Sequence, residues 1–213
     1  MTVAAVLFDM DGTLIESEAL WAVALQQLAG EYGGVLSEAA RISMVGTDMP
    51  TSMGIFHADL GQEWRDPVLG AARLVELTEV LFAAGLPWRP GARELVAEVR
   101  AAGIPAALVT STERRLVKIA LETLGPFDAV VCGDEVEFTK PHPWPYRRAA
   151  ELLGVPIDRC VAIEDSPGGM RSAAAAGAKV LAVPCEVMDL PGDLGATILP
   201  TLSGVDVKTL ERL

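Results

Sequence analysis

The sequence predicts an α/β protein in which an open parallel sheet carries helices on both faces and a helical region is inserted after the first strand. Three observations lead to this prediction. Five short apolar runs have the length and continuity of strands buried on both faces. Helical segments separate most of these runs, and each ends at a glycine, the usual residue after a helix. Finally, about seventy residues after the first run contain only helical patterning.

The strand-like runs and the helices between them alternate along the chain. The runs cover residues 3–8 (VAAVLF), 104–109 (IPAALV), 129–132 (AVVC), 160–163 (CVAI) and 180–183 (VLAV). The helical segments cover residues 92–102, 113–124, 145–153 and 167–176, followed by Gly103, Gly125, Gly154 and Gly177. Strand, helix, glycine and strand in repeated order is typical of a doubly wound parallel sheet.

The region from residue 16 to residue 88 breaks this alternation. Its helical patterning falls at residues 19–29, 38–45, 51–60 and 67–84. This is too much chain for a simple crossover between two neighbouring strands. We therefore predict a core domain of residues 1–15 and 89–213, and a helical cap domain of residues 16–88, with hinges near residues 15–17 and 86–90.

Composition limits the classes of partner. Among 213 residues, 51% are hydrophobic and 22% are charged, as in a well-packed globular protein. The formal charge of −12 argues against a nucleic-acid binder but leaves room for a small phosphorylated metabolite. No apolar run approaches the length of a membrane span, and three scattered cysteines without a leader sequence indicate a reducing cytoplasm. Nothing in the sequence indicates the oligomeric state.

Polar residues gather where the predicted strands end. They are Asp9, Asp11, Thr110, Ser111, Lys140, Glu164 and Asp165. Singly, each has an ordinary explanation as a turn former, a helix cap or a surface lysine. In an open α/β sheet, however, the carboxyl ends of the strands form one crevice, and four acids there would repel one another without a cation. Hard oxygen ligands of this kind suit Mg²⁺.

The order of these motifs identifies a family by resemblance. DMDGT, a strand ending in Thr-Ser, KPHP and then EDSPGG resemble the four motifs of the haloacid dehalogenase superfamily. The insertion resembles that family's C1 type of cap, and the phrases DGTLIESE and RPGA are similar to the subfamily of β-phosphoglucomutase and small sugar-phosphate phosphatases. The resemblance covers nearly the whole chain except a loosely matching cap and the tail after Pro184. It implies a Rossmann-like core and a Mg²⁺-dependent phosphatase.

The resemblance also implies a role for each residue. Asp9 would be the nucleophile that forms an aspartyl-phosphate, and Asp11 would protonate the leaving group and later deprotonate water. Lys140, the Thr110 hydroxyl and the Ser111 amide would bind the phosphoryl oxygens. The metal would be held by Asp9, the main-chain carbonyl of Asp11, and Asp165, with Glu164 nearby or bound through water.

Three alternatives follow from the same family. Dehalogenases lack the second aspartate, so Asp11 argues against dehalogenation. A phosphomutase of the β-phosphoglucomutase type would carry a histidine and an arginine in the cap, where this chain has Trp21 and Met49. A catalytically silent binding protein would have lost some of the acids or the lysine, all of which are present. We therefore expect hydrolysis of a small phosphomonoester.

The cap indicates the kind of substrate. It holds ten acidic and three basic residues, a formal charge of −7, which favours a neutral sugar or polyol phosphate over a substrate with further anionic groups. We expect an apolar edge of the substrate near Met49, Met53 or Trp21. Trp64 and most of the methionines are expected in the core. Arg89, at the second hinge, either reaches the substrate or is solvated.

Overall fold

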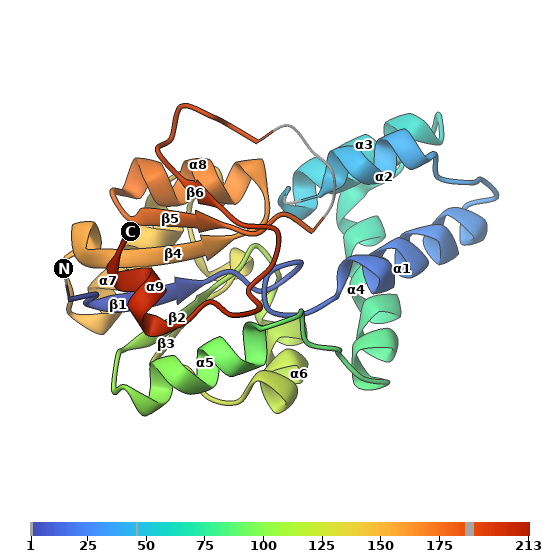
Figure 1. Ribbon diagram of the computed structural model, residues 1–213. Helices are drawn as coiled ribbons and strands as arrows, with labels where there is room; N and C mark the ends of the chain where they lie inside the picture. Colours follow the sequence, from blue (N-terminus) through green and yellow to red (C-terminus); the bar gives the residue numbers. More distant parts are fainter. Residues whose placement is uncertain (1, 46, 186–189) are drawn as a thin grey trace.

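The computed structural model describes residues 2–45, 47–185 and 190–213. At its centre lies a parallel sheet with strand order β3-β2-β1-β4-β5-β6 (Figure 1). The strands are β1 (Ala5–Phe8), β2 (Ala106–Val109), β3 (Ala129–Val131), β4 (Cys160–Glu164), β5 (Lys179–Ala182) and β6 (Thr197–Ile198). β1 pairs on one side with β2 and on the other with β4, so the first strand is central and both neighbours end beside it.

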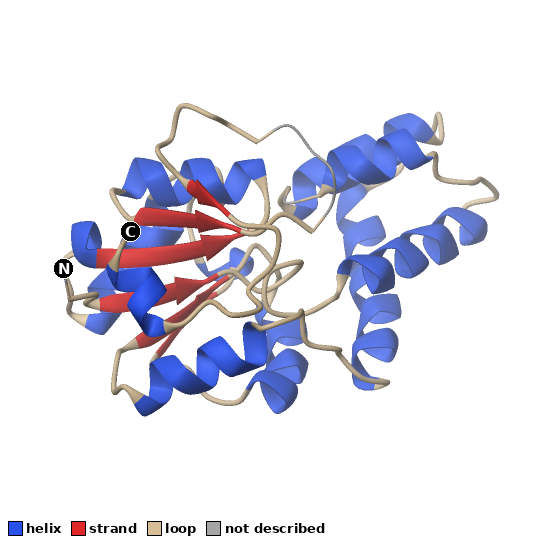
Figure 2. Ribbon diagram, in the orientation of Figure 1, coloured by secondary structure: helices blue, strands red, loops and turns tan. Residues whose placement is uncertain are grey.

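Helices cover both faces of the sheet (Figure 2). They are α5 (Ala92–Ala101), α6 (Arg114–Leu124) and α9 (Val207–Glu211) on one face, and α7 (Trp144–Leu153) and α8 (Pro167–Ala176) on the other. Two short 3₁₀ turns, η1 (Gly133–Glu135) and η2 (Ile157–Arg159), complete the connections. Along β1, Val6 and Phe8 enter the first apolar core, whereas Ala5 and Leu7 enter the second, as the two-residue period of a strand requires.

Four helices form the cap, which lies beside the sheet in Figure 1. They are α1 (Glu18–Glu31), α2 (Glu38–Met44), α3 (Met49–Asp59) and α4 (Pro67–Ala83). These helices bury an apolar cluster of their own, with Leu28 and Phe56 fully enclosed. α4 also contributes Phe82 to the core beneath the sheet, so this helix joins the two apolar clusters.

The two chain segments that connect the cap to the sheet lie side by side. Ile15 and Trp88 form an antiparallel bridge. The amide of Glu16 donates to the Pro87 carbonyl at 2.8 Å, and the Arg89 guanidinium pairs with the Glu16 carboxylate at 2.7 Å. Arg89 therefore clamps the two connections together.

The predicted fold class, an α/β sheet with an inserted helical cap, is confirmed. Each predicted strand and helix is present, with ends shifted by at most two residues. The sequence did not predict β6 or α9, both of which follow Pro184. Trp64 was expected in the core, but the residue is 76% exposed, so that expectation was wrong. In the described part of the chain, no helix has the length and apolar character needed to span a bilayer.

Candidate active site

The residues singled out at the strand ends come together at one edge of the sheet. Asp9 follows β1, Thr110 follows β2, and Glu164 is the last residue of β4 with Asp165 directly after it. Lys140 comes from the loop before α7. Because β1 lies between β2 and β4, these side chains converge at the floor of a cavity of about 110 Å³ that Asp9, Thr110, Lys140 and Asp165 help to line.

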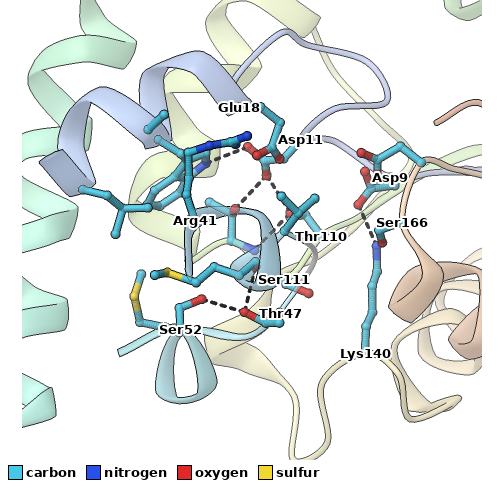
Figure 3. Close-up of a pocket in the computed structure, with 18 of the residues that line it drawn as sticks. Asp9, Asp11, Glu18, Arg41, Thr47, Ser52, Thr110, Ser111, Lys140 and Ser166 are labelled. Atoms are coloured by element: carbon cyan, nitrogen blue, oxygen red, sulfur yellow. Dashed lines mark hydrogen bonds and ion pairs between the residues drawn. The ribbon is translucent and has the colours of Figure 1, made fainter. Parts of the chain in front are cut away.

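Lys140 is enclosed and has three acceptors. Its ammonium nitrogen donates to Asp9 Oδ1 at 2.7 Å, to Glu164 Oε1 at 2.6 Å and to the Val109 carbonyl at 2.8 Å. Burial lowers the pKa of Lys140, but the negative charges of Asp9 and Glu164 outweigh it and hold the pKa above its ordinary value. Lys140 is therefore a fixed cation beside the Asp9 carboxylate (Figure 3).

Asp9 has one occupied oxygen and one without a protein partner. Oδ1 accepts from Lys140, whereas Oδ2 is buried and has no hydrogen-bond partner among the described residues. Burial, opposed by the charge of Lys140 and aided by that of Glu164, raises the pKa of Asp9 to about 7. A buried carboxylate oxygen left unpaired is costly, which is the pattern expected where a metal ion or a reacting group will bind.

The acids at this edge fit a hard cation. Ligand oxygens of Asp9, Glu164 and Asp165 lie within 4.8 Å of one another, and all three residues are buried. Burial, together with the charges of Asp9 and Glu164, holds the pKa of Asp165 well above its ordinary value. One lysine cannot neutralise three carboxylates, so the site has an excess of negative charge that Mg²⁺ would balance.

Glu164 differs from the other two acids because both of its oxygens already have partners. Oε1 accepts from Lys140 and from the Tyr146 hydroxyl at 2.5 Å. Oε2 accepts from the Asp165 amide at 3.2 Å and the Ser166 hydroxyl at 3.4 Å. Glu164 is also a predicted metal ligand; in this arrangement its oxygens face Lys140 and the start of α8.

Asp11 is held from two sides. Its Oδ1 accepts from the Ser17 hydroxyl at 2.6 Å and from the Trp21 indole nitrogen at 3.1 Å. Its Oδ2 accepts from the Thr112 hydroxyl at 2.7 Å and, more weakly, from Thr110 at 3.3 Å. Asp11 therefore lies between the first cap helix and the loop after β2, with one carboxylate oxygen facing each.

Sequence reasoning missed several of these contacts. It assigned Thr110 and Ser111 to the phosphate; both line the cavity, but here the Thr110 hydroxyl contacts Asp11 and accepts from the Thr112 amide at 3.0 Å. It gave no role to Thr112, and it did not consider Tyr146. The signal for Thr112 was its place three residues past β2, directly after Thr110 and Ser111. Tyr146 had no comparable signal, because it lies inside a helix.

Gly12 allows the two acidic loops to approach each other. Its φ of +74° favours glycine, and an added Cβ would lie 2.1 Å from Asp165 Oδ2. The same carboxylate oxygen accepts from the Cys185 thiol at 3.0 Å. A side chain at position 12 would push Asp165 away from Asp9, so the glycine in DMDGT is needed for close packing as well as for the turn.

The cap forms the opposite wall of the cavity. In Figure 3, Arg41, Thr47 and Ser52 lie on the side away from Asp9 and Lys140. The cap residues that line it are Glu18, Trp21, Ala22, Leu25, Arg41, Met44, Val45, Thr47, Met49, Ser52 and Leu74. Met49 and Trp21 thus line the cavity as expected. Met53 does not, because its side chain is fully buried in the apolar cluster of the cap.

Known proteins resemble this chain in sequence over most of its length. The family model of haloacid dehalogenase-like hydrolases matches residues 3–177. Hexitol phosphatase B of Escherichia coli is 31% identical over 192 residues, which are 84% of this chain and 83% of that protein. Phosphorylated carbohydrates phosphatase of Thermotoga maritima is 34% identical over 179 residues, 81% of each chain. The match to the chloroplastic protein SUPPRESSOR OF QUENCHING 1 of Arabidopsis thaliana, 35% identical over 85% of this chain, covers only 18% of that protein.

Solved structures share the whole fold. CbbY from Rhodobacter sphaeroides in complex with phosphate superimposes with a TM-score of 0.87 at 28% identity, over 98% of this chain and 99% of that one. A mutant of the same protein, in complex with xylulose-(1,5)bisphosphate, gives a TM-score of 0.85 at 27% identity over the same shares of the two chains. The expected enzyme class, a hydrolase of the phosphatase type, is confirmed. The chain belongs to the haloacid dehalogenase-like hydrolase family.

Proposed function

We propose that this protein is a Mg²⁺-dependent phosphatase that hydrolyses a small sugar or polyol phosphate through an aspartyl-phosphate on Asp9. The observation that supports this best is the Asp9 carboxylate, which lines the cavity and has one oxygen on Lys140 and the other buried without a partner among the described residues. The family, and the named phosphatases among the relatives, support the same reaction class.

In the first half of the proposed reaction, Asp9 Oδ2 forms a bond to phosphorus and the bond from phosphorus to the ester oxygen breaks. Asp11 gives its proton to the departing alkoxide. Lys140 balances negative charge on the phosphoryl oxygens, and Thr110 and Ser111 orient them from the loop after β2. In the second half, Asp11 takes a proton from water as the water oxygen bonds to phosphorus, and Asp9 is released as a carboxylate.

Mg²⁺, held by Asp9, Asp165 and the main-chain carbonyl of Asp11, would neutralise phosphoryl charge when bound. Asp9 and Asp165 fit this role because both are buried and their ligand oxygens lie within 4.8 Å of each other. Glu164 stays a predicted ligand, directly or through water.

The cap wall supports a hydroxylated substrate. Thr47 and Ser52 present hydroxyls 2.7 Å apart, and Glu18 and Arg41 offer a carboxylate and a guanidinium at the same cavity. Such groups can bind sugar or polyol hydroxyls, and two relatives are named for phosphorylated carbohydrates or hexitols. We also propose a cytoplasmic location, since all three cysteines are free.

A sugar bisphosphate is a second candidate substrate. The cap as a whole is acidic, yet Arg41 lines the cavity and its side chain is only 16% exposed. A guanidinium there could pair with a distal phosphate, and a CbbY structure contains xylulose-(1,5)bisphosphate. A phosphomutase is less well supported, because Trp21 donates to Asp11 and its indole cannot transfer a proton at neutral pH.

We propose that the chain divides at its two hinges into a core domain of residues 1–15 and 89–213 and a cap domain of residues 16–88. It is supported by the paired connections at Ile15 and Trp88. Limited proteolysis with and without phosphate and Mg²⁺ tests it, since cleavage should concentrate at these connections and slow when the ligands bind.

Activity is tested by phosphate release with Mg²⁺ from p-nitrophenyl phosphate, a hexitol phosphate and xylulose 1,5-bisphosphate. A phosphatase of the proposed kind hydrolyses p-nitrophenyl phosphate slowly and either the hexitol phosphate or xylulose 1,5-bisphosphate much faster. Absence of hydrolysis of all three, in protein that binds Mg²⁺ and melts cooperatively, would count against the proposed substrate class.

A further inference from the structure

Tyr146 is a buried side chain in contact with the charged cluster, and the proposed reaction does not use it. It lies near the start of α7 and is fully buried. Its hydroxyl donates to Glu164 Oε1 at 2.5 Å, the same oxygen that accepts from Lys140 at 2.6 Å. One carboxylate oxygen is thus shared by a tyrosine and the lysine that neighbours the proposed nucleophile.

Lys140 needs such support because a lysine side chain has four rotatable bonds and no preferred direction of its own. Two carboxylates attract its ammonium, and the position of Glu164 therefore decides how closely Lys140 approaches Asp9. The only remaining acceptor in the described residues, the Val109 carbonyl, lies on the neighbouring strand. A shift of Glu164 by a fraction of an ångström would move Lys140 with it.

Glu164 is in turn fixed against the start of α8. Its Oε2 accepts from the Asp165 amide and the Ser166 hydroxyl, and the positive end of the α8 dipole favours a carboxylate there. A Cβ on Gly169 would lie 1.9 Å from Oε1, so the carboxylate touches the first turn of the helix. Tyr146 closes the remaining side, where the ring also lies 5.2 Å from the Lys140 nitrogen.

We infer that Tyr146 and Glu164 form a positioning pair that holds Lys140 on Asp9. The Tyr146 hydroxyl bonds to Glu164 and not to Asp9, and Tyr146 is not among the described residues that line the cavity, so it acts through Glu164 and Lys140. This inference rests on the proposed function for its effect on rate, but the arrangement itself is independent of activity.

The first test observes the lysine directly. Of the four lysines in the chain, Lys118 and Lys208 are exposed, Lys179 is half-buried, and only Lys140 is buried. Protons of exposed ammonium groups exchange rapidly with water, so a ¹H–¹⁵N spectrum of lysine side chains at neutral pH should retain the Lys140 signal alone. A Lys140→Met sample assigns that signal by its loss.

Tyr146→Phe removes one hydroxyl and keeps the ring. We expect proton exchange of the Lys140 ammonium to speed up about tenfold or the signal to broaden beyond detection, since one hydrogen bond to a charged group is lost. The matched control is Tyr32→Phe, the same change at the only other tyrosine, which lies in the cap and packs on Phe56. An unchanged Lys140 signal in Tyr146→Phe overturns the inference.

The second test uses kinetics and metal binding. Tyr146→Phe should lower kcat about tenfold while KM changes less, because the loss acts on the transition state through Lys140. The dissociation constant for Mg²⁺, measured by calorimetry without substrate, should stay within about twofold in Tyr146→Phe, because this variant keeps all three carboxylates of the cluster. A large loss of Mg²⁺ affinity in Tyr146→Phe would mean that the hydroxyl acts on the metal site and would overturn the inference.

The two tests separate this inference from the proposed function. If the protein hydrolyses no phosphomonoester, the proposed function fails, but the ammonium spectrum still decides whether Tyr146 holds Lys140. If the protein is active and Tyr146→Phe changes neither the spectrum nor kcat, only the positioning pair is wrong. A melting temperature for each variant excludes general unfolding as the cause.

Discussion

The catalytic edge of the sheet and the cap wall face each other across one cavity, but they are built differently. At the catalytic edge, buried partners come from distant parts of the chain, as with Lys140 and Asp9, 131 residues apart. On the cap wall, polar groups bond to near neighbours, as with Thr47 and Ser52, and Arg41 pairs with the exposed Glu38. Long-range buried contacts can hold atoms to a fraction of an ångström, whereas local, part-exposed ones leave side chains able to adapt.

This difference suggests a division of labour, in which the catalytic edge stabilises the transition state and the cap wall selects the substrate. A site that stabilises a transition state needs fixed charges, and their desolvation is tolerated because each has a partner or will receive one. A wall that selects substrates can change residue by residue without disturbing the chemistry. We therefore expect substitutions at the catalytic edge to alter kcat and those on the cap wall to alter KM.

The largest effect should come from Asp9→Asn. The amide is isosteric but cannot act as the nucleophile, so kcat should fall by about three orders of magnitude or more. Phosphate release with p-nitrophenyl phosphate measures this. Asp158→Asn, an exposed aspartate in η2, is the matched control and should retain full activity. Substantial turnover by Asp9→Asn would show that Asp9 is not the nucleophile and would contradict the reaction proposed for the catalytic edge.

Metal binding should stabilise the protein in a pH-dependent way. Without metal, the pKa of Asp9 is raised from 3.8 to about 7 in the folded protein. As pH rises from 3.8 to about 7, the unfolded state therefore loses this proton before the folded state does, and the free energy of unfolding falls. Mg²⁺ needs the deprotonated carboxylates. At a Mg²⁺ concentration of about 100 times Kd it should add about 2.7 kcal/mol to stability above pH 7, and much less at pH 5.

The difference in melting temperature with and without Mg²⁺, measured at pH 5 and pH 8, tests this expectation. Asp165→Asn should abolish the stabilisation at both values. A stabilisation by Mg²⁺ as large at pH 5 as at pH 8 would contradict a role for Asp9 in holding the metal.

A substitution of Arg41 should show how the cap wall differs from the catalytic edge. If the substrate is a sugar bisphosphate, Arg41→Met should raise KM about tenfold or more and lower kcat much less, because a binding interaction is lost without a change in the reacting groups. With a hexitol phosphate the rise in KM should be smaller. Arg148→Met, at an exposed arginine of α7, is the control. A loss confined to kcat would contradict the division of labour.

The smallest effect should concern His57 in the cap. Its Nε2 is buried without a hydrogen-bond partner in the described residues, and burial and the nearby Arg65 lower its pKa below 6.5. The unfolded state therefore takes up a proton first as pH falls, and stability present above about pH 6.5 is lost below it.

His57→Phe should remove part of this loss of stability, measured as the change in melting temperature between pH 7.5 and pH 5.5. His142→Gln changes the only other histidine, which is exposed, and is the matched comparison. If both variants keep the pH dependence of the parent protein, His57 does not carry it.

Much of the fold could be predicted because its signals are local. Apolar runs of four to six residues ended at Asp9, Thr110 and Glu164, and glycines with positive φ closed the intervening helices, as at Gly103 and Gly177. The segment after Pro184, which contains β6 and α9, could not be predicted in this way. β6 is short and exposed, so its two residues carry no hydrophobic pattern, and only pairing with β5 makes them a strand.

By itself, the sequence determined the order of strands and helices, the inserted cap, and which acids and which lysine end the strands, because these depend on patterns within about ten residues. Only the tertiary structure decided how those groups divide their contacts. It put Glu164 and Tyr146 behind Lys140, left Asp9 Oδ2 unpartnered, and brought Trp21 and Thr112 to opposite sides of Asp11. Such contacts join residues ten to more than a hundred positions apart, and no local pattern records which side chain will meet which.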